Sequence, residues 1–283
     1  MIYNFGSINA DYIYDVPHLP GPGETLASTG FSRQLGGKGA NQSVAVARAG
    51  RSVRHIGAIG ADGTWMQEAM RNYGVETTHI TTVDGVSGHA VVNVDTQGEN
   101  AIVLHPGANV KQSLTKLKQA LSGSDQSDIL MLQNETNLQP EVAQFAKGVG
   151  LYVIYTAAPF DAEAVHAVLP YIDLLVMNAV EATQLHCALG DVGVPHKLIT
   201  HGADGADWIE PALSFHMSSF PVTPIDTTGA GDCFVGYVAA GLDQGLKPET
   251  ALRRASAASA LQVQKKGTAE AIPSLSEVEA FLA

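Results

Sequence analysis

Short apolar runs alternate along the second half of the chain with longer segments whose apolar residues recur at helical spacing. The apolar runs are residues 129–132, 151–155, 174–177 and 197–200. Runs of this length suit strands buried on both faces, and the segments between them are long enough for crossover helices. Such alternation is typical of parallel crossovers. The pattern predicts an α/β fold: a doubly wound, mostly parallel sheet flanked by helices.

Two segments depart from this alternation. Residues 10–34 carry three prolines and several glycines between short apolar stretches, and residues 86–105 alternate apolar and polar positions around a turn at 96–99. The second pattern predicts a hairpin. We expect both segments to form a small β-sheet lid, and residues 1–9, 35–85 and 106–283 to form the α/β core. Small sheets are marginally stable and leave open edges, so a homodimer packed through the lid is expected.

Polar side chains follow several of the predicted strands. An apolar run at residues 2–8 ends in Asn9-Ala10-Asp11, the run at 129–132 is followed by Glu135, and the run at 174–177 by Asn178. Ligands of open α/β sheets bind outside the carboxyl ends of the strands. The repetition of polar side chains at these ends predicts a binding cleft there.

The most informative stretch is Asp226-Thr227-Thr228-Gly229-Ala230-Gly231-Asp232, which runs into an apolar helical pattern. Small residues leave main-chain N–H groups uncovered at the positive end of a helix, where they can hold an anion such as a phosphoryl group. We interpret the amides of Gly229, Ala230 and Gly231 as that anion site. Asp232 is then a base for a substrate hydroxyl, with a low pKa expected near the helix end. A glycine-rich loop merely capped by Asp232 is the alternative.

A second glycine-rich turn, Gly36-Gly37-Lys38-Gly39, precedes a helix predicted at residues 41–49. It lacks the spacing of a P-loop and of a dinucleotide-binding fingerprint. It would let the backbone approach a small polyol, with Lys38 and Asn41 as directional donors. An ordinary turn before a helix is the alternative.

Composition narrows the class of protein. The chain has 283 residues, is 45% hydrophobic, carries a formal net charge of −12 and has two cysteines. The negative charge argues against sequence-independent nucleic-acid binding. No apolar stretch is long enough for a membrane span, and no basic-then-apolar leader begins the sequence, so we expect a cytoplasmic protein that binds no membrane.

The two glycine-rich motifs, in this order and far apart, resemble the signatures of the ribokinase-like (PfkB) sugar kinases. The resemblance implies ATP, Mg²⁺ and a sugar substrate, with the ATP γ-phosphate moving to O5 of D-ribose to give ribose 5-phosphate and ADP. It implies sugar ligands at Asn9, Asp11, Gly37, Lys38, Asn41, Glu135 and Asp232. It implies nucleotide-binding residues at Asn178, Thr200, Gly202 and Gly205. Finally, it implies a Mg²⁺ ligand, direct or through water, at Glu181 and a K⁺ site at Asp226 and Thr228.

Other interpretations stay open at this stage. Glu135 could cap the following helix, and Asn178 with Glu181 could be an ordinary helix start. Two positions depart from the family pattern: Tyr237 stands where a small residue is usual, and Ala271 where many members carry a serine near K⁺. The alternatives for function are a related kinase acting on a nucleoside or another sugar, and a non-catalytic sugar- or nucleotide-binding regulator.

Overall fold

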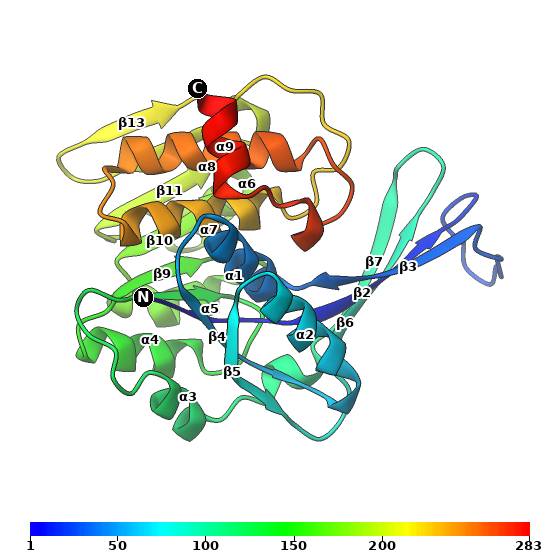
Figure 1. Ribbon diagram of the computed structural model, residues 1–283, viewed down its shortest axis with the longest axis horizontal. Helices are drawn as coiled ribbons and strands as arrows, with labels where there is room; N and C mark the ends of the chain where they lie inside the picture. Colours follow the sequence, from blue (N-terminus) through cyan, green and yellow to red (C-terminus); the bar gives the residue numbers. More distant parts are fainter.

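The computed structural model describes residues 1–283 and contains one large and one small β-sheet (Figure 1). The large sheet has nine strands in the order β13-β12-β11-β10-β9-β8-β1-β4-β5. Pairing is parallel from β11 to β5, while β12 and β13 run antiparallel at one edge. The strands are β1 Ile2–Phe5, β4 Val53–Ile59, β5 Glu76–Thr82, β8 Ile129–Gln133, β9 Tyr152–Thr156, β10 Leu174–Asn178, β11 His196–Thr200, β12 Ala206–Ile209 and β13 Ser214–Met217.

Helices cover both faces of this sheet, as a doubly wound fold requires. One buried cluster joins it to α1 Lys38–Arg48, α2 Thr64–Asn72, α7 Ala230–Asp243, α8 Pro248–Gln262 and α9 Leu275–Leu282. The opposite cluster joins it to α3 Leu114–Ala120, α4 Gln139–Gly148, α5 Ala162–Val168 and α6 Ala179–Leu189. Single-turn 3-10 helices lie at η1 Ala61–Gly63, η2 Gly107–Val110, η3 Leu169–Tyr171, η4 Gly202–Asp204 and η5 Ala269–Ala271. The predicted fold class is confirmed.

The central strands β8 and β10 lie where the sequence has apolar runs. All five residues of β8 are buried, as are the first four of β10, so these strands cannot show polar alternation. The edge strands β5 and β13, and β12 next to β13, were not predicted. They contain polar residues on one face and short turns, and β12 and β13 pair antiparallel where strand–helix alternation predicts a parallel crossover.

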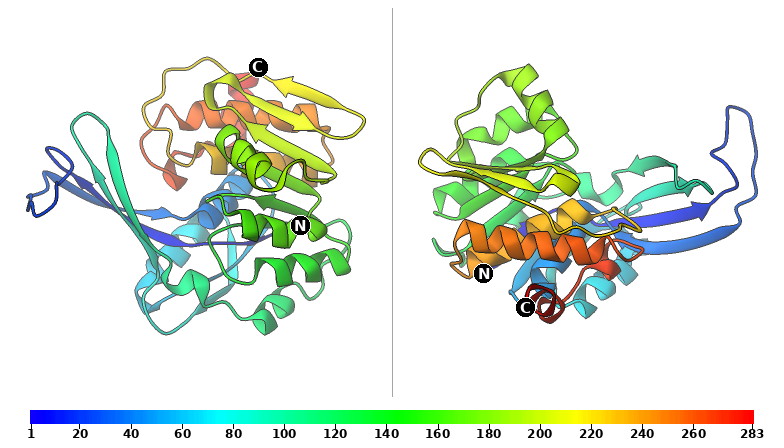
Figure 2. Two further views of the ribbon diagram at one scale, coloured as in Figure 1. Left: turned by 180° about the vertical axis from the view of Figure 1, so that it is seen from behind. Right: turned by 90° about the horizontal axis from the view of Figure 1, so that it is seen from above.

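The small sheet has the order β3-β2-β6-β7 and extends away from the body of the molecule (Figures 1 and 2). Its strands are β2 Asn9–Asp15, β3 Gly30–Gly36, β6 Gly88–Val94 and β7 Asn100–His105. The hairpin predicted at 86–105 is present, with β6 and β7 antiparallel from His89↔His105 to Val94↔Asn100. The strand predicted at 2–8 is shorter, because the chain leaves the large sheet after Phe5 and enters the small one at Asn9.

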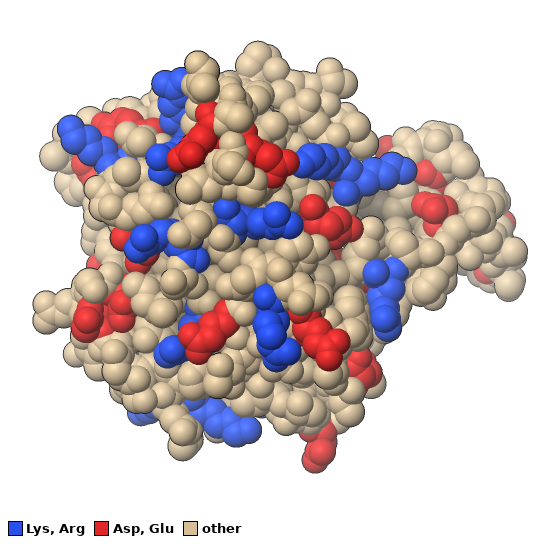
Figure 3. All heavy atoms as spheres, viewed as in Figure 1, with Lys and Arg blue, Asp and Glu red and all other residues tan.

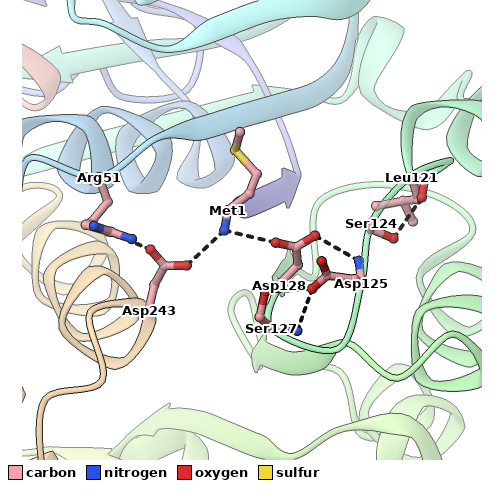
Figure 4. A network of polar contacts seen from close by, with 8 residues as sticks. All are labelled: Met1, Arg51, Leu121, Ser124, Asp125, Ser127, Asp128 and Asp243. Atoms are coloured by element: carbon pink, nitrogen blue, oxygen red, sulfur yellow. Dashed lines mark hydrogen bonds and ion pairs between the residues drawn. The ribbon is translucent and has the colours of Figure 1, made fainter.

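An ion-pair network ties the start of β1 to α7 at the end of the sheet opposite the strand carboxyl ends (Figure 4). The amino group of Met1 lies 2.9 Å from Asp128 and 3.1 Å from Asp243, and Arg51 Nε lies 2.6 Å from Asp243. Asp243 is almost fully buried, so its two cationic partners offset the free energy lost on burying its charge.

The charged surface is mixed. On the face drawn in Figure 3, Lys and Arg side chains lie among Asp and Glu, and neither sign gathers in one broad patch. None of the helices combines the length and the apolar composition that a bilayer-spanning segment needs.

Candidate active site

A glycine turn at the start of α7 presents free main-chain donors. Gly229 adopts the left-handed conformation, with φ 74°, and the helix begins at the next residue. The amides of Gly229, Gly231 and Asp232 have no acceptor within the chain, whereas the Ala230 amide donates to the Thr227 carbonyl at 3.2 Å. Consecutive left- and right-handed residues form a concave anion-binding nest. Of the three amides predicted as donors, Ala230 is therefore engaged, and Asp232 contributes one that the sequence analysis missed.

Asp232 is buried, with 8% of its surface exposed, and both of its carboxylate oxygens accept side-chain amides of α1. Asn41 Nδ2 donates to Oδ2 at 3.2 Å, and Gln42 Nε2 donates to Oδ1 at 3.1 Å. The carboxylate accepts no main-chain N–H, so it does not cap the helix. Burial raises its pKa, opposed by the Lys38 ammonium and the two amides. The low pKa expected from the helix end is wrong, because desolvation outweighs these favourable contacts.

The Gly36-Gly37-Lys38-Gly39 turn brings α1 against the ends of β1 and β2. Gly37 has φ 91°, and a Cβ there would lie 2.9 Å from the Asn9 amide nitrogen. At Gly39 a Cβ would lie 2.5 Å from the Gly6 carbonyl carbon. Both glycines are therefore required for close approach of the backbone.

Three carboxylates contributed by different elements influence the charge of Lys38. Its main-chain amide donates to Glu135 at 3.2 Å, and Asp232, Glu135 and Glu181 raise the pKa of its ammonium. Glu135 also accepts the Ser7 hydroxyl. Helix α4 begins four residues after Glu135, so the capping alternative for this glutamate is wrong.

Asp11 projects over Gly36 on the face of the small sheet that it shares with Asn9. Burial, reinforced by the charges of Glu135, Glu270 and Asp232, raises its pKa to about 7. Asn9 is buried, and its Oδ1 accepts Asn109 Nδ2 at 2.8 Å. The structure thus gathers Asp11, Lys38 and Glu135 into one electrostatically coupled cluster, with Asn9 beside it at the start of β2.

A buried polar network supports the site from beneath, and sequence reasoning missed it. Gln133 Nε2 donates to Gln42 Oε1 at 2.7 Å and to Asn4 Oδ1 at 2.8 Å. Asn4 in turn donates to Ser43 and to the Gly39 carbonyl. The only signal in the sequence is polar residues within runs that otherwise read as buried, at Asn4 and Gln133.

On the other side of the Gly229 turn lies a pocket of about 740 Å³. Thr200, Gly202 and Gly205 line it as predicted, while Asn178 does not. Its other walls were not predicted: residues 218–222, the face of α8 that carries Ser256, Ser259 and Ala260, and Phe234 of α7. These positions show no motif, because small and apolar residues at helical spacing look like ordinary packing. Gly231, whose amide is free, also lines the pocket.

Asn178 and Glu181 form a capping box at the start of α6. Asn178 Oδ1 accepts the Glu181 amide and Glu181 Oε2 accepts the Asn178 amide, both at 2.8 Å. The helix-start interpretation is thus correct locally. The other carboxylate oxygen of Glu181 has no hydrogen-bond partner, and Glu181 is close enough to influence the Lys38 pKa. No group of three or more His, Cys, Asp or Glu side chains is placed to hold a metal ion.

Asp226 fastens the Gly229 turn to the segment after α8. Its Oδ1 accepts the Thr228 amide at 2.9 Å and its Oδ2 accepts the Gly267 amide at 3.0 Å. These amides lower its pKa against the opposing effect of partial burial. Tyr237 adds a second connection, because its buried hydroxyl donates to the Pro273 carbonyl at 2.8 Å. That bond gives the unusual Tyr237 a structural role near Ala271.

Comparison with known proteins agrees with this arrangement. The family model described as pfkB family carbohydrate kinase matches residues 1–275. A ribokinase from Haemophilus influenzae is 37% identical over 98% of this chain and 96% of its own length. The crystal structure of a ribokinase from Thermotoga maritima superposes with a TM-score of 0.90 at 32% identity, covering 100% of this chain and 99% of that one. An Arabidopsis thaliana ribokinase structure complexed with ribose and ATP gives a TM-score of 0.88 at 29% identity, covering 99% and 98%.

Proposed function

The chain belongs to the pfkB family of carbohydrate kinases, and on that premise we propose that it transfers the ATP γ-phosphate to O5 of D-ribose. The observation that carries the proposal is the position of Asp232. Its carboxylate is held by Asn41 and Gln42 of the first glycine motif and stands beside the free amides of the second. A hydroxyl nucleophile and a phosphoryl group can therefore meet at one point. Relatives named for ribose at 32–37% identity support the substrate.

The sugar would lie among the polar side chains at the base of the small sheet. Asp11 and Glu135 can accept hydrogen bonds from sugar hydroxyl groups, and Lys38 can donate hydrogen bonds to sugar oxygens. Asn9 and Asn41 each have one atom of the side-chain amide committed within the protein, Oδ1 in Asn9 and Nδ2 in Asn41, which orients the other atom. Asn41 Oδ1 is buried without a partner, which supports its use as an acceptor for a sugar hydroxyl.

Phosphoryl transfer asks the protein mainly for alignment and charge neutralisation. Asp232 would orient the O5 hydroxyl and accept its proton. The Gly229, Gly231 and Asp232 amides would hold the γ-phosphate where negative charge develops. The nucleotide would occupy the pocket between Thr200–Gly205 and α8, with its phosphates directed toward Gly231. The lid over the sugar would exclude water and suppress hydrolysis of ATP.

The residues present fit Mg²⁺, which uses few carboxylates and keeps several waters. Glu181 has one free carboxylate oxygen near the proposed phosphate path and would hold the ion, which neutralises phosphate charge when bound. For a monovalent cation, each oxygen of Asp226 accepts one amide and keeps a lone pair, and Thr228 adds a hydroxyl. Ala271 offers no side-chain oxygen, so K⁺ there would depend on main-chain carbonyls.

The division into an α/β core and a lid at residues 10–34 and 86–105 is part of the proposal, as is a homodimer formed through the lid. The lid exposes Ile102 and Leu104, at 57% and 48%. Strand pairing puts both on the face that carries Asp11, because Ala90 pairs with Asp11 and with Leu104. A second copy packed there would bury an apolar surface that continues from the sugar cluster.

The test is ADP release measured with ribose, deoxyribose, fructose, adenosine and buffer alone. The proposal expects ribose to give the largest kcat/KM. Phosphorylation of adenosine but not of ribose would establish the nucleoside-kinase alternative. Absence of turnover with every compound, together with measurable ribose or ATP binding, would establish the regulator.

A further inference from the structure

Two side chains of α8 contact the carbonyl groups of the Gly229 turn from behind. Gln262 Nε2 donates to the Thr228 carbonyl at 3.2 Å, and Ser259 Oγ donates to the Ala230 carbonyl at 3.1 Å. The two residues are three positions apart and so lie on the same face of α8. A Cβ built on Gly229 would lie 3.3 Å from Gln262 Nε2, which shows that the glutamine lies directly against the turn.

These carbonyls belong to the peptide groups whose N–H donors are free. The Thr228 carbonyl shares a peptide plane with the Gly229 amide, and the Ala230 carbonyl shares one with the Gly231 amide. Both peptides are trans, so carbonyl and N–H point in opposite directions. A donor that fixes the carbonyl from the α8 side therefore fixes the direction in which the N–H points on the other side. Gln262 and Ser259 therefore orient the Gly229 and Gly231 amides, two of the proposed anion donors, through bonds to the carbonyls of the same peptide groups.

Stability alone does not account for a glutamine at position 262. The residue is 1% exposed, and its Oε1 has no hydrogen-bond partner. Burying an amide with one polar atom unsatisfied carries a free-energy penalty that an apolar side chain would avoid. The single bond to the Thr228 carbonyl is the interaction that only a donor at this position can make.

We infer that Gln262, assisted by Ser259, is a positioning residue for phosphoryl transfer: it orients the Gly229 peptide so that its amide meets the charge of the transferring phosphate. The inference rests on the proposed function and deepens it. Neither side chain is assigned as a catalytic residue, because the donor group of each is bonded to a carbonyl of the turn; Ser259 also lines the pocket proposed for the nucleotide. Their effect is expected in the transition state more than in the ground state, because hydrogen bonds aimed at developing charge act mainly there.

The experiment compares Gln262→Met and Ser259→Ala with wild type and with Gln264→Met. Gln264 lies two residues further along, is exposed and donates to the Ala260 carbonyl, so it controls for the same substitution away from the turn. Methionine keeps the length of glutamine and removes the donor. We expect Gln262→Met to lower kcat about tenfold, with KM for the sugar changed by less than about twofold. Ser259→Ala should lower kcat by a smaller factor, and Gln264→Met should leave it unchanged.

Nucleotide affinity separates positioning from a general disturbance of the pocket. MgADP with aluminium fluoride imitates the transferring phosphoryl group, which MgADP alone lacks. Gln262→Met should weaken binding of the aluminium fluoride complex about tenfold and leave MgADP affinity unchanged. Equal loss of both affinities, or a kcat equal to wild type in both α8 variants, would overturn the inference. A wild-type chain that phosphorylates no sugar contradicts the proposed function instead, so the two failures are distinguishable.

Discussion

Gln42 Nε2 donates to Asp232 Oδ1 at 3.1 Å, joining two glycine-rich motifs that lie 190 residues apart in the sequence. Asn41, the preceding residue, holds the other oxygen. Because both donors belong to the first turns of α1, the carboxylate is oriented by the same element whose N-terminal turn carries Lys38. The proposed base and the proposed sugar site are therefore built as one unit, before any substrate binds.

The first prediction concerns this contact. Gln42→Met removes an amide that stabilises the ionised form of Asp232, so the pKa of that carboxyl should rise further. The acidic limb of the kcat–pH profile should then move to higher pH, with kcat at its plateau lowered about tenfold. Gln67→Met removes a glutamine bonded to the Thr77 carbonyl away from the site and serves as the control. A profile that superposes on that of wild type would contradict this role.

The second prediction is that Asp11 lowers the stability of the folded chain while it contributes to ribose binding. Its pKa is about 7 in the folded chain and near 3.8 when unfolded, so the unfolded state releases its proton first as pH rises. Stability should fall between about pH 4 and pH 7 and stay low above that range. Asp11→Asn removes this penalty, and its Tm should exceed that of wild type by about 2–4 °C near pH 8 and by less near pH 5.

The same variant should bind ribose more weakly, because asparagine has one acceptor oxygen where the carboxylate has two, and its NH2 group can only donate. Thermal melts at both pH values and a ribose titration measure the two effects. A lower Tm at pH 8, or undiminished ribose affinity, would count against this account of Asp11.

The third prediction tests the lid as an interface. Ile102→Asp should convert a dimer to a monomer in light scattering, because a charge would be buried on the face proposed to pack against a second copy. Val103→Asp is the matched control. Val103 is the next residue along β7 and is 68% exposed, but its side chain points to the opposite face of the sheet. If Val103→Asp dissociates the dimer and Ile102→Asp does not, the interface lies on the other face of the lid. A wild-type protein that is monomeric would contradict the proposed interface altogether.

The fourth prediction concerns Mg²⁺. Glu181→Gln keeps a capping box but loses the negative charge, so the Mg²⁺ concentration needed for half-maximal activity should rise about tenfold. Glu141→Gln, in the first turn of α4, controls for loss of a helix N-terminal charge elsewhere. An unchanged Mg²⁺ requirement would show that Glu181 acts only as a cap.

Much of the fold followed from the sequence because the central strands are buried on both faces and therefore consist mainly of apolar residues. The strands β12 and β13 were missed for the opposite reason: at a sheet edge, residues such as Asp207 and His216 face solvent and break the apolar pattern. Their pairing depends on tertiary contact with β11, which no local pattern reports.

The candidate site was predicted as far as its motifs extend. Asp232, Lys38 and Glu135 could be named because glycine turns and strand ends mark their positions. Gln42, Asn109 and Gln262 could not, because each acts through a contact more than 30 residues away in sequence. The raised pKa of Asp232 was missed likewise, because a helix end is visible in the sequence and the depth of burial is not.

The measurement that tests the central claim most directly is turnover and ribose binding by Asp232→Asn. Asparagine keeps the size of the side chain and cannot accept the O5 proton as a carboxylate does. We predict that ADP release in the presence of ribose falls by about 10²–10⁴-fold while ribose binding by calorimetry stays measurable. Turnover within about threefold of wild type would contradict the assignment of Asp232 as the base.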